Sequence, residues 1–167
     1  MTDFRTPRPL ATGDVLSDFR YGVDVLDSWL RGYARNNDRS GGSKTMVSVT
    51  TEGRVAGYYC LSASSLVRED APQRLAHRAP DPIPVVLIGR LAIDQEFTGL
   101  GLGTALLQHA VLQAISAAEI IGMRAILVHA LTDDVIPFYE RFGFERFPGS
   151  SRALYLLVSD ARATLVG

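Results

Sequence analysis

The stretch from residue 83 to residue 107, IPVVLIGRLAIDQEFTGLGLGTALL, constrains this chain more than any other. It begins as an apolar run typical of a buried strand, passes through a polar turn, reaches glycines at 99, 101 and 103, and continues with the pattern of a helix. A glycine loop that leads into a helix brings several backbone N–H groups to the positive helix end, where they bind pyrophosphate. Glycine suits such a loop because a Cβ atom would hold the phosphate away from the amides. We therefore expect a nucleotide or a nucleotide-bearing cofactor.

The residues around the glycines exclude two phosphate-binding motifs. A P-loop needs Lys followed by Ser or Thr after the glycines, but Lys44 is the chain's only lysine. The dinucleotide fingerprint needs a glycine at position 104, which is Thr104. On its own, G-x-G-x-G fits a close-packed turn equally well. A second motif after the apolar strand 124–130 favours the ligand site, because it places a tyrosine in the last turns of a helix that ends in glycine: Pro137-Phe138-Tyr139-Glu140-Arg141-Phe142-Gly143-Phe144.

Together these motifs resemble the GCN5-related N-acetyltransferase (GNAT) superfamily, and within it the toxins of toxin–antitoxin modules that acetylate aminoacyl-tRNA. The phosphate loop of that superfamily reads Gln/Arg-x-x-Gly-x-Gly/Ala. Residues 98–103 match it, except that Thr98 stands where Gln or Arg is usual. The likeness to the toxins is carried by three further segments, 19–30, 57–62 and 89–94, so it extends over nearly the whole chain.

The resemblance implies an α/β (α+β) GNAT fold: a mixed, mostly antiparallel sheet with flanking helices, in which strands 83–93 and 124–130 form a parallel pair that splays apart. Pantetheine would lie in the wedge between these strands and pair with Leu91, Ala92 and Ile93. The pyrophosphate site would consist of the loop and the first helical turn, Thr98, Gly99, Leu100, Gly101, Leu102, Gly103 and Thr104. The resemblance also implies acetyl-CoA as co-substrate. No His/Cys/Asp/Glu group in the sequence has metal-ligand spacing, so we expect no metal.

Acetyl transfer from a thioester to an amine needs a neutral amine, a stabilised oxyanion and a proton for the departing thiolate. Tyr139 is the candidate general acid, because a phenol with a pKa of about 10 holds its proton at neutral pH. A core role suits Phe138 and Phe142 better than Tyr139. No base is obvious: Asp94 and Glu96 lie near the wedge, but each also fits a solvated turn. An α-amine with a pKa of about 8 does not require a dedicated base.

Three residues are candidates for binding the acceptor. Arg90 interrupts an apolar strand, which is costly unless its head reaches water or an anion, and we expect it to contact an RNA phosphate or the substrate rather than a structural ion pair. Tyr58 and Tyr59 are adjacent on one strand, so one faces the core and the other is free to wall the acceptor site. His129 fits a core histidine better than a proton shuttle.

The composition, 47% hydrophobic and 21% charged, fits one globular domain over residues 1–167. A single cysteine, Cys60, excludes an internal disulfide and suits a reducing cytoplasm, and we expect no signal peptide and no membrane segment. The net charge of −1 permits RNA binding only through local basic clusters, which occur at 31–39, 68–78 and 141–152.

Hydrophobic periodicity and turn residues predict the order of the elements. After a short first strand at 4–10 we expect a helix over 22–36, with Asp27 on a polar face, and a loop over 36–43. The remaining elements are a hairpin of strands 46–51 and 55–62, a short helix within 63–82, strand 83–93, a helix over 101–121 capped by Gly122, strand 124–130, a helix over 133–142 and a last hairpin of 144–147 with 154–158.

We therefore expect an acetyl-CoA-dependent N-acetyltransferase that acetylates the α-amino group of aminoacyl-tRNA and thereby blocks translation in the cytoplasm. Its partners would be aminoacyl-tRNA and a cognate ribbon-helix-helix antitoxin, without a membrane; a homodimer is left open. Two alternatives remain: an acetyltransferase of a small amine or a protein amine on the same fold, and a non-catalytic acyl-CoA-binding module.

Overall fold

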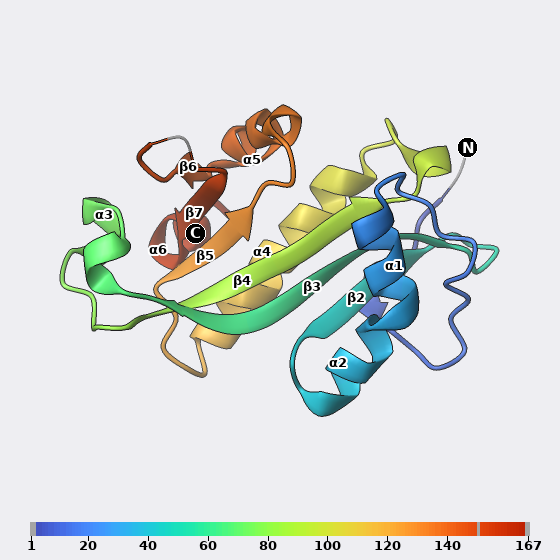
Figure 1. The fold of residues 1–167 in the computed structure, drawn as a ribbon, viewed down its shortest axis with the longest axis horizontal. Helices are drawn as coiled ribbons and strands as arrows, with labels where there is room; N and C mark the ends of the chain where they lie inside the picture. Colours follow the sequence, from blue (N-terminus) through green and yellow to red (C-terminus); the bar gives the residue numbers. More distant parts are fainter. Residues whose placement is uncertain (1–2, 150, 166–167) are drawn as a thin grey trace. The chain divides into compact units, whose positions relative to one another are not determined.

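The computed structural model describes residues 3–149 and 151–165 (Figure 1). Within these residues the strands form one seven-stranded sheet in the order β1-β2-β3-β4-β5-β7-β6. The β4 and β5 strands pair in parallel, whereas β1/β2, β2/β3, β5/β7 and β6/β7 pair antiparallel. This arrangement confirms the predicted mixed α/β fold. The strands are β1 (Arg8–Pro9), β2 (Lys44–Val49), β3 (Val55–Leu66), β4 (Ile83–Ile93), β5 (Ala125–His129), β6 (Glu145–Arg146) and β7 (Ala153–Leu157).

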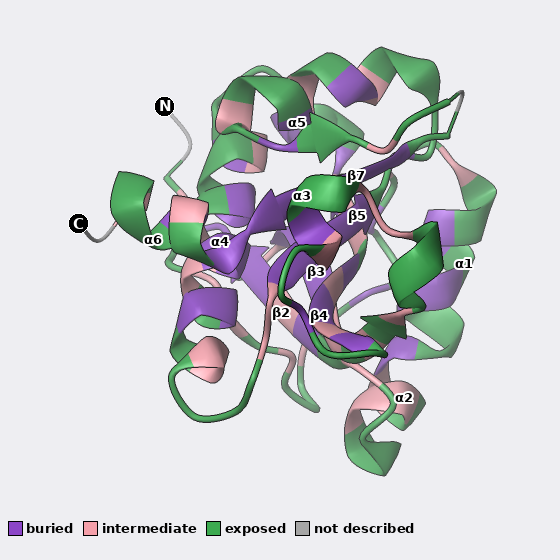
Figure 2. Cartoon of the chain, turned by 90° about the vertical axis from the view of Figure 1, so that its left-hand side faces the viewer, coloured by how far each residue is buried: buried purple, intermediate pink, exposed green. Residues whose placement is uncertain are grey.

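The helices are interspersed with the strands along the chain. They are α1 (Asp24–Gly32), α2 (Ala34–Ser40), α3 (Gln73–Ala76), α4 (Leu102–Ala118), α5 (Ile136–Phe142) and α6 (Val158–Leu165), with 3-10 turns at Arg68–Asp70, Gln95–Phe97 and Asp133–Val135. Most strand residues are buried, whereas the residues of α2 are mostly intermediate or exposed (Figure 2).

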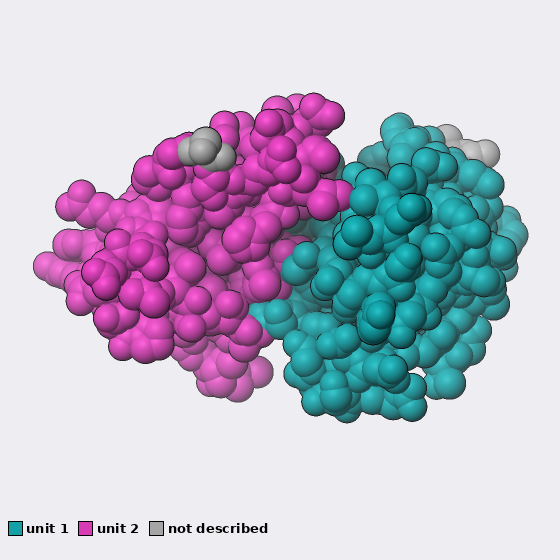
Figure 3. All heavy atoms as spheres, viewed as in Figure 1, with its two compact units in different colours: residues 1–62, 89–110 teal, residues 63–88, 111–167 magenta. Residues whose placement is uncertain are grey.

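The chain forms two compact units, which Figure 3 shows in different colours. Unit 1 consists of Met1–Ser62 and Gly89–Ala110, and unit 2 of Ala63–Ile88 and Val111–Gly167. The boundaries fall inside β3, β4 and α4, so each of these elements contributes residues to both units. The single domain expected over 1–167 stays a prediction.

The core of unit 1 forms where α1 packs on the strands. The Trp29 ring stacks on Tyr58 with centroids 6.1 Å apart, and the Phe19 ring meets Tyr58 edge-on at 5.5 Å. Gly57 allows the first half of α4 to come close to β3, because a Cβ atom there would lie 2.8 Å from Leu106 Cδ1 and 3.2 Å from the Ala92 carbonyl oxygen. Unit 1 therefore holds α1 and the start of α4 against the same strands.

The core of unit 2 is built on the parallel pair. The register runs from Val85 opposite Ala125 to Ile88 opposite Val128, and β7 continues the sheet beyond β5. Leu75 of α3 and Ile83 of β4 belong to the same buried cluster. At its surface Arg74 binds Glu145 and Asp160, each at 2.6 Å, and so ties α3 to β6 and α6.

The predicted helix over 22–36 is in fact two helices. The chain bends at Tyr33 (φ −126°, ψ −21°), and α2 occupies most of the segment predicted as a loop. The sequence ARNNDRS gave no helical signal because Ala34 is its only buried residue, so α2 has no apolar stripe. A C-cap at Gly41, with φ +82°, closes it.

The predicted end of α4 was also wrong, and the last helix was missed. The α4 helix ends at Ala118, and Gly122 is not its left-handed cap, since its φ is not positive. Instead, the amides of residues 119–121 bind the carbonyls of Ser116 and Ala117 as a loosened last turn. The α6 helix was not predicted, because it buries only two of its eight residues and so shows little periodicity.

Candidate active site

The glycine loop of unit 1 has the backbone conformation that its sequence predicts. Gly99 and Gly101 have φ values of +76° and +84°, which residues with a Cβ atom rarely adopt. Helix α4 begins at Leu102, and Ala105 donates its amide to the Gly101 carbonyl at 3.2 Å. The amides before Ala105 lie in the first turn of a 17-residue helix, where backbone donors have no intrahelical partner. This is a helix end suited to an anion.

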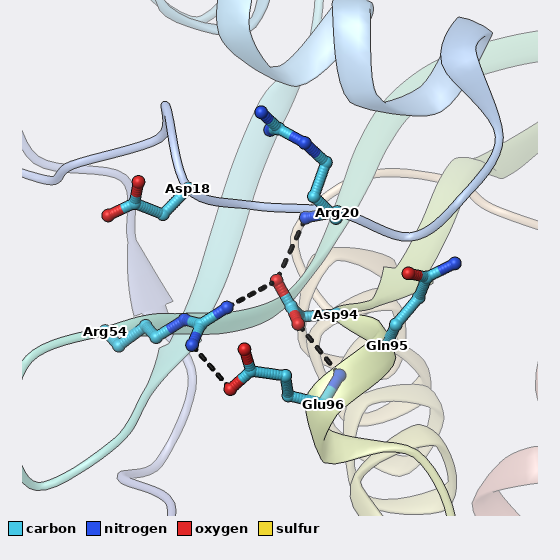
Figure 4. A pocket seen from close by; sticks show the side chains of 6 residues that line it. All are labelled: Asp18, Arg20, Arg54, Asp94, Gln95 and Glu96. Atoms are coloured by element: carbon cyan, nitrogen blue, oxygen red, sulfur yellow. Dashed lines mark hydrogen bonds and ion pairs between the residues drawn. The ribbon is translucent and has the colours of Figure 1, made fainter.

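Asp94 fixes the start of this loop (Figure 4). Its side chain is 1% exposed, and its oxygens accept the amide of Glu96 at 2.9 Å, the amide of Arg20 at 2.9 Å and Nη2 of Arg54 at 3.2 Å. Asp94 is therefore not the solvated turn residue considered from the sequence, and these donors already occupy its carboxylate. Glu96 is a solvated side chain that binds Arg54 at 2.6 Å.

These residues line an open polar cavity of about 430 Å³ together with Asp18, Arg20 and Gln95. In Figure 4 the Arg54 guanidinium lies between the carboxylates of Asp94 and Glu96, and Asp94 faces the backbone of Arg20. The cavity therefore lies where segment 17–22 meets the beginning of the glycine loop.

Arg90 lies on β4 and stacks on α1. Its guanidinium carbon is 4.2 Å from the centre of the Trp29 ring, a cation–π contact. No carboxylate among the described residues lies within ion-pair distance of it, which agrees with the expectation that Arg90 is not held by a structural ion pair. Its role toward RNA stays a prediction.

Tyr139 lies in unit 2, on α5. Pro137 stands in the first turn of this helix, and Gly143, with φ +116°, ends it as the sequence predicted. The Tyr139 ring meets Phe138 edge-on at 5.1 Å and Phe144 at 5.8 Å. It is 8% exposed, and therefore more buried than Phe138 and Phe142, which we expected to be the packing residues. The phenol is held by aromatic packing, and its catalytic role stays a prediction.

Comparison with known proteins identifies the family. Residues 43–146 match the acetyltransferase (GNAT) domain family, and a tRNA-acetylating toxin of Mycobacterium tuberculosis is 42% identical over 99% of both chains. The chain is a GNAT acetyltransferase.

Two solved structures resemble this GNAT chain closely. The toxin AtaT complexed with acetyl-methionyl-tRNAfMet superposes with a TM-score of 0.88 at 28% identity, covering 98% of this chain and 100% of that one. A mutant AtaT bound to acetyl-CoA and to the C-terminus of the antitoxin AtaR superposes with a TM-score of 0.83 at 26% identity, covering 99% of both chains.

The two adjacent tyrosines of this GNAT chain lie on opposite faces of β3, and both are completely buried. The Tyr58 hydroxyl donates to the Leu26 carbonyl at 3.0 Å, and the Tyr59 hydroxyl lies 2.6 Å from Nδ1 of His109 on α4. Burial raises the pKa of both phenols. Each tyrosine therefore has a packing role here, and a place for either in the acceptor site stays a prediction that its burial does not favour.

Three other side chains differ from the sequence-based interpretation or refine it. His129 is exposed at the end of β5, so it is not a core histidine. Burial raises the pKa of the Cys60 thiol to about 12, so Cys60 is a packing residue beside Thr45, as expected. Asp27, expected on a polar face, is 2% exposed. Asp27 lies three residues before Leu30 and seven before Ala34, both of which are buried. Positions with this spacing share one helix face, so the sequence contained a signal that Asp27 is buried.

The basic clusters differ in how far neighbouring carboxylates neutralise them. Arg74 and Arg152 form ion pairs, with Glu145 and Asp160 for the first and Asp133 for the second. The cluster at 31–39 contacts only uncharged oxygens: Arg31 binds the Phe19 carbonyl, Arg35 the carbonyls of Ala11 and Asp14, and Arg39 the Asn36 side chain. Among the described residues, no arginine of this cluster forms an ion pair.

Within the residues that the structure describes, no group of three or more His, Cys, Asp or Glu side chains could hold a metal ion. Over the same residues, no helix is long and apolar enough to cross a membrane.

Proposed function

We propose that this GNAT chain transfers the acetyl group of acetyl-CoA to the α-amino group of an aminoacyl-tRNA. The observation that carries the choice of acceptor is the 42% identity, from end to end, with a tRNA-acetylating toxin. The acetyl-methionyl-tRNA complex of AtaT supports the same acceptor class. An acetylated α-amine cannot attack in peptide-bond formation, so the product would block translation in the cytoplasm.

In this reaction one group of residues binds acetyl-CoA and another residue transfers a proton. First-turn amides of α4, with the loop from Thr98 to Thr104, bind the pyrophosphate of acetyl-CoA, and Leu91, Ala92 and Ile93 of β4 pair with its pantetheine arm. The neutral α-amine attacks the thioester carbonyl, and the bond from carbon to sulfur breaks. Tyr139 gives its proton to the departing thiolate, and the proton lost by the amine restores the phenol through water. The products are the N-acetylaminoacyl-tRNA and CoA.

The chain carries no obvious general base. Asp94 is occupied by three donors, and Glu96 is paired to Arg54. An α-amine with a pKa of about 8 is already partly neutral at neutral pH, whereas a lysine amine at about 10.4 is not. The site therefore favours an α-amine over a lysine as the acceptor.

Residues 1–167 would act as one catalytic domain, and a cognate antitoxin would keep it inactive. A complex of the related AtaT with the antitoxin AtaR supports this class of partner. We keep a ribbon-helix-helix DNA-binding protein as the proposed antitoxin.

Release of CoA with a panel of acceptors tests the proposal. The protein is incubated with acetyl-CoA and charged tRNA, deacylated tRNA, small amines or no acceptor, and free thiol is measured. We expect rapid release of CoA with charged tRNA and with none of the other acceptors. Release with small amines but not with charged tRNA would favour an acetyltransferase of a small amine or a protein amine, and an intact thioester with every acceptor would favour a non-catalytic acyl-CoA-binding module.

A further inference from the structure

Segment 19–22, Phe-Arg-Tyr-Gly, precedes α1 and crosses the beginning of the glycine loop. Its backbone makes an unusual set of contacts, because three consecutive amides, those of Arg20, Tyr21 and Gly22, all donate to carboxylates that are almost completely buried. Two aspartates from different elements, Asp94 and Asp27, provide these carboxylates.

Asp94 joins the segment to the glycine loop. Its Oδ2 accepts the Arg20 amide at 2.9 Å, and the next residue, Gln95, donates its own amide to the Arg20 carbonyl at 2.7 Å. Two consecutive residues, Asp94 and Gln95, therefore bind both the amide and the carbonyl of Arg20. At the same time Oδ1 of Asp94 caps the 3-10 turn that leads to Gly99.

Asp27 joins the same segment to α1. Its carboxylate accepts the amides of Tyr21 at 2.8 Å and of Gly22 at 3.3 Å. The fit is close at Gly22, whose φ is +103° and whose missing Cβ atom leaves the space filled by the Gln95 side chain. The glycine loop, segment 19–22 and α1 thus form a continuous chain of contacts inside unit 1. At the α1 end of these contacts lies Trp29, on which Arg90 stacks.

We propose that Asp94 is a positioning residue that fixes α1 and Arg90 relative to the glycine loop by holding the backbone of Arg20. The inference rests on the proposed function, in which Arg90 and the basic residues of α1 meet the acceptor RNA and the glycine loop holds acetyl-CoA. Asp94 connects the glycine loop to segment 19–22, and Asp27 connects segment 19–22 to α1. The loss of either carboxylate therefore releases α1 from the loop.

This arrangement predicts a specific kinetic defect. The pyrophosphate contacts are backbone amides several residues beyond Asp94, and the pantetheine contacts are backbone groups of β4. Neither set uses the Asp94 side chain, so both survive the loss of its charge, whereas the acceptor side loses its alignment. A purely structural role would instead lower the melting temperature and the active fraction, and would leave KM for both substrates unchanged.

The test compares Asp94→Asn and Asp27→Asn with Glu96→Gln. The control removes a carboxylate from the same Arg54 without touching segment 19–22. We expect both aspartate variants to raise KM for charged tRNA about tenfold while the Kd of acetyl-CoA changes less than about threefold, and the double variant to add little to the worse single one. Glu96→Gln should keep both constants. A wild-type KM in Asp94→Asn, or an equal loss of acetyl-CoA affinity, would overturn the proposal.

Hydrogen–deuterium exchange provides a readout independent of tRNA. In the wild type we expect slow exchange over residues 19–27, slowed further by acetyl-CoA alone; in Asp94→Asn the exchange should rise about tenfold and no longer respond to acetyl-CoA. If Asp94→Asn does not fold, Asp27→Asn carries the same comparison. If the wild type does not acetylate charged tRNA, the proposed function fails, and the exchange data alone decide whether the contacts couple loop and helix. Equal exchange with and without acetyl-CoA in the wild type would refute that coupling.

Discussion

At the scale of single residues, Tyr58, Tyr59 and Tyr139 differ in how completely the protein buries them. Tyr58 and Tyr59 are completely buried. Tyr139 keeps 8% of its surface exposed at the edge of an aromatic group with Phe138 and Phe144. A proton donor must reach a reacting atom, so the partly exposed Tyr139 remains the best candidate acid.

Tyr139→Phe should lower kcat by about 10² to 10⁴, the usual contribution of general acid catalysis. The ring contacts with Phe138 and Phe144 remain in the variant, so the melting temperature and the Kd of acetyl-CoA should change little. Steady-state kinetics with charged tRNA and a thermal melt measure both. Near-normal turnover would mean that water or another residue protonates the thiolate.

Phe144→Leu is the matched packing control for Tyr139. Phe144 is 3% exposed and touches the Tyr139 ring, but it has no proton to give. We expect this variant to lower stability by about 1–3 kcal/mol with a smaller loss of kcat than in Tyr139→Phe. The opposite order of the two kcat values would argue against Tyr139 as the acid.

His109 should make stability depend on pH below about 7. Burial lowers its pKa below the ordinary value, and its Nδ1 lies 2.6 Å from the Tyr59 hydroxyl. As the pH falls through the unfolded pKa of about 6.5, the unfolded chain takes up a proton that the folded chain resists, so the free energy of unfolding decreases. His109→Asn, which keeps an acceptor that does not titrate, should flatten this part of the curve in urea titrations. An unchanged pH profile in the variant would exclude His109 as its source.

The sequence predicted backbone conformations better than side-chain environments. The glycines with positive φ and the C-cap at Gly143 were predictable, because few other residues adopt these conformations. The buried carboxylates of Asp27 and Asp94 were not, because their partners are backbone amides, which leave no mark on residue identity. The exposure of His129 likewise depends on where β5 ends.

At the scale of elements, the glycine loop and the helix that follows it place different demands on their glycines. Gly101 needs a positive φ, whereas Gly103 lies inside the first turn of α4, where other residues are tolerated. A substitution of Gly103 therefore tests the effect of a side chain on ligand binding without disturbing folding.

Gly103→Asp should abolish acetyl-CoA binding, because a carboxylate would compete for the amides that hold pyrophosphate. Gly103→Asn has nearly the same shape without the charge, so it should weaken binding less. Both variants should melt near the wild-type temperature. Calorimetry that gives both variants the wild-type Kd would remove the loop from the cofactor site.

Gly57→Ala tests the packing of α4 on β3. The added methyl group would lie 2.8 Å from Leu106 Cδ1 and 3.2 Å from the Ala92 carbonyl oxygen, so the Leu106 side chain and the neighbouring backbone must adjust. We expect a loss of about 1–3 kcal/mol in denaturant unfolding. Gly53→Ala is the comparison for a positive φ without crowding (φ +90°, nothing within 4 Å); equal costs for the two would show that close packing is not what selects Gly57.

Elements with a buried face were predictable, and those without one were not. The β4 strand was predicted at its observed bounds, because its apolar run is flanked by prolines and by a polar turn. The α2 and α6 helices bury few residues, so their sequences carry no periodic signal. Their ends are set by local caps and contacts.

At the scale of the whole molecule, the net charge of −1 conceals an uneven distribution. Arg31, Arg35 and Arg39 contact uncharged oxygens, whereas Arg74 and Arg152 form ion pairs. We expect an RNA acceptor to meet unit 1 through these three arginines and Arg90.

Acetylation of charged tRNA should depend strongly on salt, because phosphate contacts release counterions. Arg90→Ala and the joint removal of Arg31, Arg35 and Arg39 should raise KM for tRNA and reduce the salt slope. Removal of Arg152, which is already paired, should have a smaller effect. All variants should keep the Kd of acetyl-CoA. A KM for tRNA that is flat between about 50 and 200 mM salt would contradict an RNA acceptor.

Mass spectrometry of the tRNA end tests the central claim most directly. Charged tRNA is incubated with acetyl-CoA and the protein, digested with nuclease, and the terminal aminoacyl-adenosine is analysed. We predict one added acetyl group on the α-amine with the wild type, and none with Tyr139→Phe over the same time. An unmodified aminoacyl-adenosine in a reaction that consumes acetyl-CoA, or an acetyl group found elsewhere on the tRNA, would contradict the account.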